Sequence, residues 1–268
     1  MDYIHGTHEE EQERLFILNR LLNERCLEKI ELIGDELTLD IGSGLGVFTR
    51  MLAHRLFYGR IVGVERSPQQ LEKALKLSRS DEINLPVEFR EGSAYDLPLE
   101  SAEWGNFDLV FIRFLLEHLK DPLKALSQAK KAMKPGAKII LVDDDHENFR
   151  ITPSTPAFGF LWNLYCKVYE KMGNDPFIGR NLVTLLHQAG FHDFKIDFVL
   201  FGAAASESDF FYYANNLIGI LAGAKEQIIE VGDITPEVFD ANLAEIDGWS
   251  KKPDATLWYA ANWAEAIC

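Results

Sequence analysis

The chain has 268 residues, 47% of them hydrophobic and 26% charged, which is enough to bury one sizeable core of ordinary globular composition. Its net charge of −15 excludes the basic surface that nucleic acids and anionic membranes attract, so we expect neither partner. The scattered cysteines, Cys26, Cys166 and Cys268, fit neither a disulfide framework nor a zinc site and predict reduced thiols. No stretch has the layout of a signal peptide or the length of a transmembrane helix, so we expect a soluble cytoplasmic protein.

The amino-terminal part of the chain begins with a helix pattern and then a strand pattern. Apolar residues at helical spacing predict an amphipathic helix from about Glu9 to Ile30, which Gly34 ends. An apolar strand over residues 37–41 then runs into a glycine-rich turn. A helix over residues 47–56 follows this turn.

Helix and strand patterns alternate as far as residue 142. Helices are predicted to begin at Ser67-Pro68 and at Asp121-Pro122, because each pair places a capping side chain directly before a proline. The expected strands between and after them cover residues 61–65, 87–90, 107–112 and 138–142. This alternation predicts a parallel sheet with helices on both faces.

Beyond Asp143 the pattern becomes more helical. Four aromatic residues share one face of a predicted helix: Phe158, Trp162, Tyr165 and Tyr169. This face either packs in a core or lines an apolar pocket. The remaining expected elements are a helix over residues 181–188, a strand over 194–201, helices over 207–230 and 236–249, and a last strand over 255–263.

Together these elements predict an α/β fold with a doubly wound, mostly parallel seven-stranded sheet and helical insertions. No repeat or interdomain linker interrupts the pattern, so we expect one domain over residues 1–268. Within it we expect an amino-terminal helical cap (1–33), a core that binds a cofactor (34–150) and helical insertions (151–178 and 206–250).

The glycine-rich turn, Asp40-Ile41-Gly42-Ser43-Gly44-Leu45-Gly46, carries the clearest functional signal. Alternate glycines leave the backbone bare and permit a tight turn from strand to helix. The following helix directs its unpaired N–H groups toward this turn, and Asp40 adds an acceptor beside it. The turn therefore predicts a pocket for a nucleoside cofactor. A dinucleotide fingerprint would place its third glycine at Val47, so a nicotinamide cofactor is disfavoured.

Other polar residues follow the neighbouring strands, and ligands of open α/β sheets bind at the carboxyl ends of strands. Glu65 ends the second strand, where a carboxylate can hold both hydroxyls of a ribose. Ser93 and Ala94 follow the third strand, where a backbone N–H and a small side chain can read an adenine edge. Arg113 ends the fourth strand, where either a surface role or a cofactor role is open.

Six separated motifs follow one another along the chain: D-x-G-x-G-x-G, Val64-Glu65, Glu91 to Pro98, Phe107 to Val110, Leu116 to Pro122 and Leu141 to Asp143. In that order they resemble the class I S-adenosylmethionine (SAM)-dependent methyltransferases of the small-molecule type. The resemblance covers about residues 37–145, with residues 179–191 similar to a late helix of the family. It implies a Rossmann-like methyltransferase fold, SAM as cofactor and a small-molecule methyl acceptor, but it does not identify the acceptor.

The resemblance also implies roles for individual residues. The glycines Gly42, Gly44 and Gly46 would lie against the methionine part of SAM, with Arg113 beside it. Asp40 and Ser43 are further candidate cofactor-binding residues. Glu65 would bind the ribose, Arg66 would flank the adenine ring and the Ala94 N–H would donate to it. Tyr3 and Gln12 would contact the cofactor if the amino-terminal segment folds over it. The family often has an acid where this chain has Ser93, so Asp96 or a backbone carbonyl would have to bind the adenine amine.

Methyl transfer from a sulfonium is an in-line displacement that mainly needs orientation and a dry site. His118 is the candidate general base, although a structural role in its helix is the simpler interpretation. The run Asp143 to His146 could bind a metal only if adjacent residues converged on one ion, so we expect no metal. The expected function is SAM-dependent methyl transfer. The alternatives are a SAM-binding or nucleoside-binding module without turnover and, less well supported, a nicotinamide oxidoreductase. A homodimer is compatible with the sequence.

Overall fold

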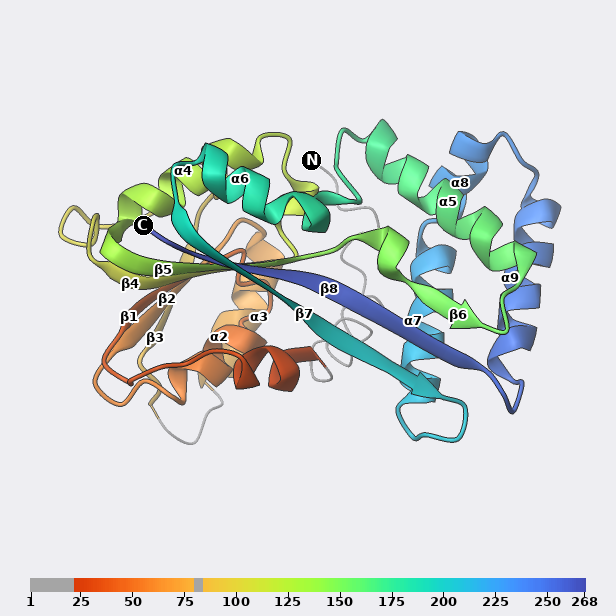
Figure 1. Cartoon of the computed structure of the whole chain (residues 1–268), viewed down its shortest axis with the longest axis horizontal. Helices are drawn as coiled ribbons and strands as arrows, with labels where there is room; N and C mark the ends of the chain where they lie inside the picture. The colour runs from red at the N-terminus through yellow and green to blue at the C-terminus, as the bar shows by residue number, and fades with distance from the viewer. Residues whose placement is uncertain (1–21, 80–83) are drawn as a thin grey trace. The chain divides into compact units, whose positions relative to one another are not determined.

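The computed structural model describes residues 22–79 and 84–268 of the chain, which divides into two compact units (Figure 1). The sheet unit comprises Asn23–Asp144, Ile178–Phe198 and Asn262–Cys268. Among the described residues, the helical unit comprises Leu22, Asp145–Phe177 and Val199–Ala261. The finer division expected from the sequence, into a cap, a core and insertions, stays a prediction.

Five parallel strands form the centre of the sheet unit. In spatial order they are β3 (Val87–Glu91), β2 (Arg60–Glu65), β1 (Leu37–Ile41), β4 (Phe107–Arg113) and β5 (Met133–Asp143). The register places Asp40 beside Gly63 of β2 and beside Phe111 of β4. Because these strands are parallel, their carboxyl ends lie at one edge of the sheet.

The last strand, β8 (Thr256–Ile267), runs antiparallel to β5 and pairs Ile140 with Glu265. A long strand, β7 (His192–Ala204), also pairs with β8. In the helical unit, the short strand β6 (Arg150–Thr152) pairs with the beginning of β8. The expected doubly wound, mostly parallel fold is confirmed. The sequence pattern did not reveal β6, because three residues are too short to show a strand period.

Helices cover both faces of the parallel strands within the sheet unit (Figure 1). Helices α2 (Val47–Ala53) and α3 (Pro68–Arg79) lie on one face, and α4 (Pro122–Ala132) and α6 (Leu182–Gln188) lie on the other. The predicted caps are present. The Ser67 hydroxyl accepts the Gln70 N–H at 3.4 Å, and the Asp121 carboxylate accepts the Lys124 N–H at 3.0 Å.

The core of the sheet unit follows from the period-two pattern of its strands. Residues two apart on the same strand face α4 and α6 and are buried, namely Leu39 and Ile41, Val62 and Val64, Val110 and Ile112, and Ile139 and Leu141. Leu126 of α4 and Leu186 of α6 pack against them, and both are fully buried. This packing fixes the strand ends that carry the candidate site.

The helical unit consists mainly of α5 (Pro156–Lys171), α7 (Phe210–Gly223), α8 (Lys225–Gly232) and α9 (Pro236–Ser250), with a short 3₁₀ turn at His146–Asn148. The helix expected over residues 207–230 is two helices instead. The helical conformation is interrupted at Ala224, directly after Gly223, and glycine is a poor helix former. On α5, Trp162, Tyr165 and Tyr169 are buried and contact the ring of His146.

Only part of the predicted amino-terminal helix lies in the described residues, where residues 22–28 are helical. None of the helices formed by residues 22–79 and 84–268 is both long and apolar enough to cross a membrane.

Candidate functional site

The glycine turn after β1 is held by backbone hydrogen bonds to the end of β2. The N–H groups of Gly42 and Ser43 both donate to the carbonyl of Val64, at 2.8 and 3.0 Å. The turn then closes on itself, because the Gly46 N–H donates to the Ser43 carbonyl at 2.9 Å. Gly46 is the amino-terminal cap of α2, so the turn leads directly into that helix as the sequence predicts.

Gly44 and Gly46 are required for different reasons. Both have positive φ, 56° for Gly44 and 69° for Gly46, a conformation that other residues adopt only with strain. A Cβ on Gly46 would lie 2.4 Å from the ring of Phe89, so the protein's own packing requires a glycine there. Among residues 22–79 and 84–268, a Cβ on Gly44 would approach only the end of the Gln70 side chain, at 3.2 Å. The backbone at Gly44 is therefore open on the side where a side chain would project.

Glu65 joins the turn to the loop after β2. One oxygen of its carboxylate accepts the Gly44 N–H at 2.9 Å, and the other accepts the Ser67 N–H at 2.7 Å. A carboxylate offers about four acceptor positions, so these two bonds leave acceptor capacity for further hydroxyl groups. The side chain is half-buried at the carboxyl end of β2. The structure thus brings together the glycine turn and the acid that the sequence places about twenty residues apart.

Asp40 is a buried acid beneath the turn. Its carboxylate accepts the Thr49 hydroxyl at 2.5 Å, and its side chain is 4% exposed. Burial raises the pKa of Asp40 to about 6, although the Thr49 hydrogen bond and the charge of Arg113 act in the opposite direction. The sequence identified Asp40 as an acceptor beside the turn, but not the Thr49 bond that holds it.

Arg113 ends β4 with its guanidinium packed on aromatic rings. It lies 4.5 Å from the ring centroid of Phe48 and 5.5 Å from that of Phe114. Its Nη1 is also 4.0 Å from the sulfur of Cys26, whose pKa is raised chiefly by burial. Arg113 is therefore a half-buried cation next to the buried Asp40 rather than a surface arginine.

The loop after β3 forms a tight turn at Ser93. The Ser93 hydroxyl accepts the Tyr95 N–H at 3.1 Å, and the Ser93 carbonyl accepts the Asp96 N–H at 3.0 Å. At the start of the loop, the Gly92 N–H donates to the carbonyl of Glu65, which ties the loop to β2. Asp96 is exposed and Ala94 is half-buried. The Ser93 side chain is thus used to shape the loop.

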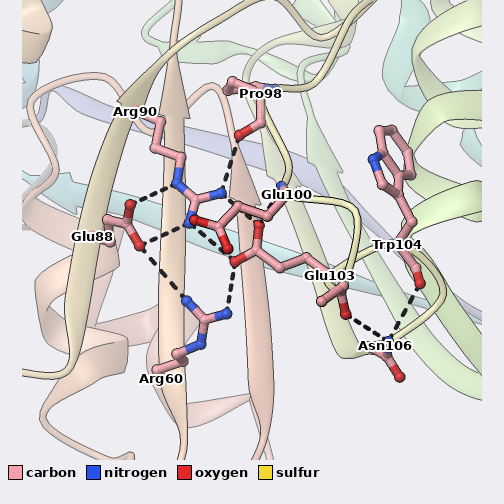
Figure 2. A network of polar contacts seen from close by, with 9 residues as sticks. Arg60, Glu88, Arg90, Pro98, Glu100, Glu103, Trp104 and Asn106 are labelled. Atoms are coloured by element: carbon pink, nitrogen blue, oxygen red, sulfur yellow. Dashed lines mark hydrogen bonds and ion pairs between the residues drawn. The ribbon is translucent and has the colours of Figure 1, made fainter.

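A charged network fixes the far end of the same loop (Figure 2). Arg90 of β3 donates to the Pro98 carbonyl at 3.0 Å and to the Glu103 carboxylate at 2.6 Å. Glu103 is 3% exposed, and it also accepts an N–H of Arg60 at 2.6 Å and the backbone N–H of Glu100 at 2.8 Å. These hydrogen bonds, chiefly that from Arg90, lower the pKa of Glu103 to about 2. Sequence reasoning missed this network, because its partners come from separate elements.

His118 ends a short 3₁₀ turn (Leu116–His118) after β4. Its Nε2 lies 3.4 Å from an oxygen of Glu117, and its side chain is 25% exposed. The same turn is held by Asp143, a fully buried acid at the end of β5 that accepts the Leu116 N–H at 2.8 Å. Burial, with the nearby charges of Glu117 and Asp144, raises the pKa of Asp143 well above its ordinary value. Asp143 therefore positions the turn that carries the candidate base, a role that the sequence did not indicate.

Four predicted site residues remain, namely Arg66, Ser43, Tyr3 and Gln12. Arg66 is exposed at the start of the loop after β2. Ser43 has a buried hydroxyl without a hydrogen-bond partner in residues 22–79 and 84–268, and its Cβ lies close to Gly63. Its backbone therefore serves the turn, while its side chain points toward the sheet. Tyr3 and Gln12 lie outside the described residues.

Comparison with known proteins bears on whether the glycine turn is of the SAM type or of the dinucleotide type. Residues 39–141, from β1 to β5, match the family described as a methyltransferase domain. This segment is therefore similar to methyltransferase domains. The match favours a SAM-type turn over a dinucleotide turn for the D-x-G-x-G-x-G segment. The match also weighs against the nicotinamide oxidoreductase alternative.

Individual relatives match longer stretches of the chain than this segment. The chain is 27% identical to a demethylmenaquinone methyltransferase of Lactiplantibacillus plantarum over 201 residues, which cover 70% of this chain and 84% of the relative. It is 29% identical over 167 residues to an uncharacterized transposon protein of Streptomyces fradiae, covering 62% of this chain and 46% of that protein. Among solved structures, a SAM complex of phosphoethanolamine N-methyltransferase 2 from Haemonchus contortus matches with a TM-score of 0.54 and 19% identity, covering 96% of this chain and 52% of that chain. The matched region thus spans about half the length of the last two proteins.

Proposed function

We propose that the protein transfers a methyl group from SAM to a small organic acceptor. We further propose that the cofactor site consists of the glycine turn, Glu65, Asp40, Arg113 and the loop from Ser93. The observation that carries this proposal is the hydrogen bond between Gly44 and Glu65, because it places an acid with free acceptor capacity beside an open stretch of backbone.

The residues at the turn fit the two ends of SAM. A bare backbone at Gly44 lets the methionine part approach closely, since the nearest obstacle to a Cβ there is the end of a flexible glutamine. Glu65 can accept hydrogen bonds from both ribose hydroxyls in addition to its two backbone donors. Asp40 and Arg113 supply opposite charges next to the turn, for the ammonium and the carboxylate of the methionine part.

The loop after β3 is the proposed adenine site. Its turn at Ser93 presents the backbone of Ala94, whose N–H can donate to an adenine nitrogen. The Ser93 hydroxyl already accepts the Tyr95 N–H, so it is poorly placed to accept from the adenine amine as well. We assign that contact to the exposed carboxylate of Asp96, with Arg66 flanking the ring.

The chemistry requires little of the chain beyond orientation. Bound SAM supplies an electrophilic methyl group on a sulfonium, which an acceptor atom attacks in line. The chain holds the donor in one position through the turn and Glu65, and it keeps the buried side of the site dry. If the acceptor enters in its protonated form, His118 is the proposed base, with Glu117 beside its Nε2 to stabilise the protonated ring.

Two measurements test this function. Titration calorimetry should show binding of SAM and of S-adenosylhomocysteine, with no binding of NAD at the same concentrations. A screen of small phenols, amines and quinols for release of S-adenosylhomocysteine should then identify an acceptor class. Absence of SAM binding would overturn the cofactor site. Binding of SAM without turnover on any acceptor would favour the alternative of a SAM-binding module without catalysis.

A further inference from the structure

Strand β7 carries an exposed apolar stripe that the proposed cofactor site does not use. Phe194, Ile196 and Phe198 alternate along the strand and therefore share one face of it. They are 37%, 69% and 43% exposed, although side chains of this size are normally buried. The residues between them, Lys195 and Asp197, are exposed on the opposite face.

β7 is also an edge strand. In the described part of the chain it pairs with β8 alone, so its other side has backbone N–H and C=O groups without a neighbouring strand. It is 13 residues long, whereas strands are typically about five or six residues long. A long edge with an exposed apolar face is a ready template for pairing with another chain.

The sequence of this edge is complementary to itself in one antiparallel register. When two copies of β7 pair about a two-fold axis at Ile196, residues whose numbers add up to 392 lie opposite each other. Lys195 then faces Asp197 of the second copy, and Asp197 faces Lys195, so two opposite-charge pairs form. On the other face Phe194 lies beside Phe198 of the second copy, and Ile196 lies beside its own counterpart.

A two-fold axis perpendicular to the sheet keeps the apolar side chains of both copies on the same face. A shift by one residue would remove this match, because it would place charged residues opposite aromatic ones or like charges opposite each other. Asp197 already pairs with Lys29 of its own chain at 2.5 Å, but both side chains remain partly exposed, at 55% and 30%. The carboxylate can therefore accept a second cation from a neighbouring strand.

We propose that β7 is a homodimer interface, in which two copies of the chain join their sheets by antiparallel pairing of residues 194–198 about Ile196. The occupant of this edge is thus a second copy of the same protein. The charged residues of the strand then face opposite charges across the axis, and the apolar side chains of the two copies pack beside each other on one face of the joined sheet.

The first test uses charge reversal and sedimentation velocity over a range of protein concentrations. The wild-type protein should show a monomer–dimer equilibrium. Lys195→Asp and Asp197→Lys should each weaken dimerisation about tenfold or more, because each places like charges opposite each other twice. The double variant with both changes should recover dimerisation to within about threefold of the wild type, since the opposite-charge pairs are restored in reverse. Far-UV circular dichroism checks that each variant is folded.

The second test is a disulfide crosslink between the two copies at Ile196, on the proposed two-fold axis. A residue on the axis meets its own copy, with Cα atoms about 4.5 to 5.5 Å apart, which is within the range for a disulfide. In a chain with Cys268→Ser, the Ile196→Cys variant should form a covalent dimer under copper–phenanthroline oxidation. The matched control is Phe57→Cys in the same background, because Phe57 is 80% exposed in the same unit and lies outside β7. That control should stay monomeric on a denaturing gel.

Three results would overturn the proposal: a wild-type protein that is monomeric throughout, single reversals that leave dimerisation unchanged, or equal crosslinking of the two cysteine variants. The first of these would mean that Lys195 and Asp197 simply protect a solvated edge. SAM affinity should be the same in the charge variants and the wild type, because β7 contributes none of the residues assigned to the cofactor site. Failure of the dimer is therefore distinguishable from failure of the proposed function.

Discussion

The carboxylate of Glu65 accepts the Gly44 N–H at 2.9 Å, so the acid at the end of β2 and the bare turn after β1 form one unit. The bond fixes the position of an acid that would otherwise be a flexible side chain at a strand end. Glu65 therefore has a structural role in addition to the ligand-binding role that we propose, and a variant at this position must separate the two.

We expect Glu65→Ala to weaken SAM binding by about 1–3 kcal/mol, because hydrogen bonds to a charged carboxylate are lost. Calorimetry measures the affinity, and a thermal melt reports how far the loss of the Gly44 and Ser67 bonds loosens the fold. The matched control is Glu91→Ala, an exposed acid at the end of the neighbouring strand. An unchanged SAM affinity in Glu65→Ala would remove this residue from the site.

Alanine substitutions at Gly44 and Gly46 should have different effects. In Gly46→Ala the new Cβ meets the Phe89 ring at 2.4 Å, so we expect a loss of about 3 kcal/mol of folding stability from overpacking and backbone strain. In Gly44→Ala only the strain of a positive φ applies, about 1–2 kcal/mol, while the methyl group fills the open backbone. Urea denaturation and SAM titration measure the two effects. Equal SAM affinity in Gly44→Ala and wild type would contradict close approach of the cofactor at Gly44.

SAM affinity should depend on pH through Asp40. The pKa of this buried acid is about 6 in the folded protein, and SAM carries a net positive charge that favours the ionised carboxylate. Affinity should therefore rise as the pH increases through about 6 in the wild type and vary less in Asp40→Asn. Calorimetry between about pH 5 and pH 8 provides the comparison. A parallel pH dependence in both proteins would show that another group is responsible.

The same ionisation should affect stability with the opposite trend. Because the folded pKa of Asp40 is raised above its unfolded value, its protonated form stabilises the fold at low pH. This stability is lost as the pH rises through about 6. Relative to Asp40→Asn, the wild type should lose up to about 3 kcal/mol of unfolding free energy between about pH 4 and pH 7. Denaturant titrations at several pH values measure this difference, and a constant difference would assign a different pKa to Asp40.

Substitution of the buried Glu103 should destabilise the fold more than substitution of an exposed residue of the same network. Glu103→Gln weakens the hydrogen bonds of a buried carboxylate to Arg90 and Arg60, so we expect a loss of about 2 kcal/mol. The control Glu88→Gln removes a partner of Arg90 that is 52% exposed, and the expected loss is below about 1 kcal/mol. Urea denaturation at neutral pH compares the two. Similar losses in both variants would show that burial of Glu103 adds nothing.

The lowered pKa of Glu103 also determines how the stability of the fold changes at low pH. Its contribution to stability is present above the unfolded pKa and is lost as the pH falls toward about 2. The stability difference between the wild type and Glu103→Gln should therefore shrink below about pH 4.

The sequence by itself determined most of the helices and strands, and it identified the strand ends that carry the candidate site. Strand β1, the turn from Gly42 to Gly46 and the acid at Glu65 were predictable, because short-range patterns fix strands, tight turns and helix caps. The match to the methyltransferase motifs depended on the same local stretches. The break at Ala224 and the three-residue strand β6 were missed, since local propensity there is weak and tertiary pairing decides.

Only the tertiary structure decided how residues from separate elements meet. The contact of Gly46 with Phe89, the hold of Asp143 on the Leu116 N–H and the pairing of Arg90 with Glu103 depend on strand register and on helix packing. Such contacts join positions 13 to 43 residues apart for reasons that no local pattern encodes. The exposure of Phe194, Ile196 and Phe198 is of the same kind, because alternation marks a face but the neighbours of β7 decide whether that face is covered.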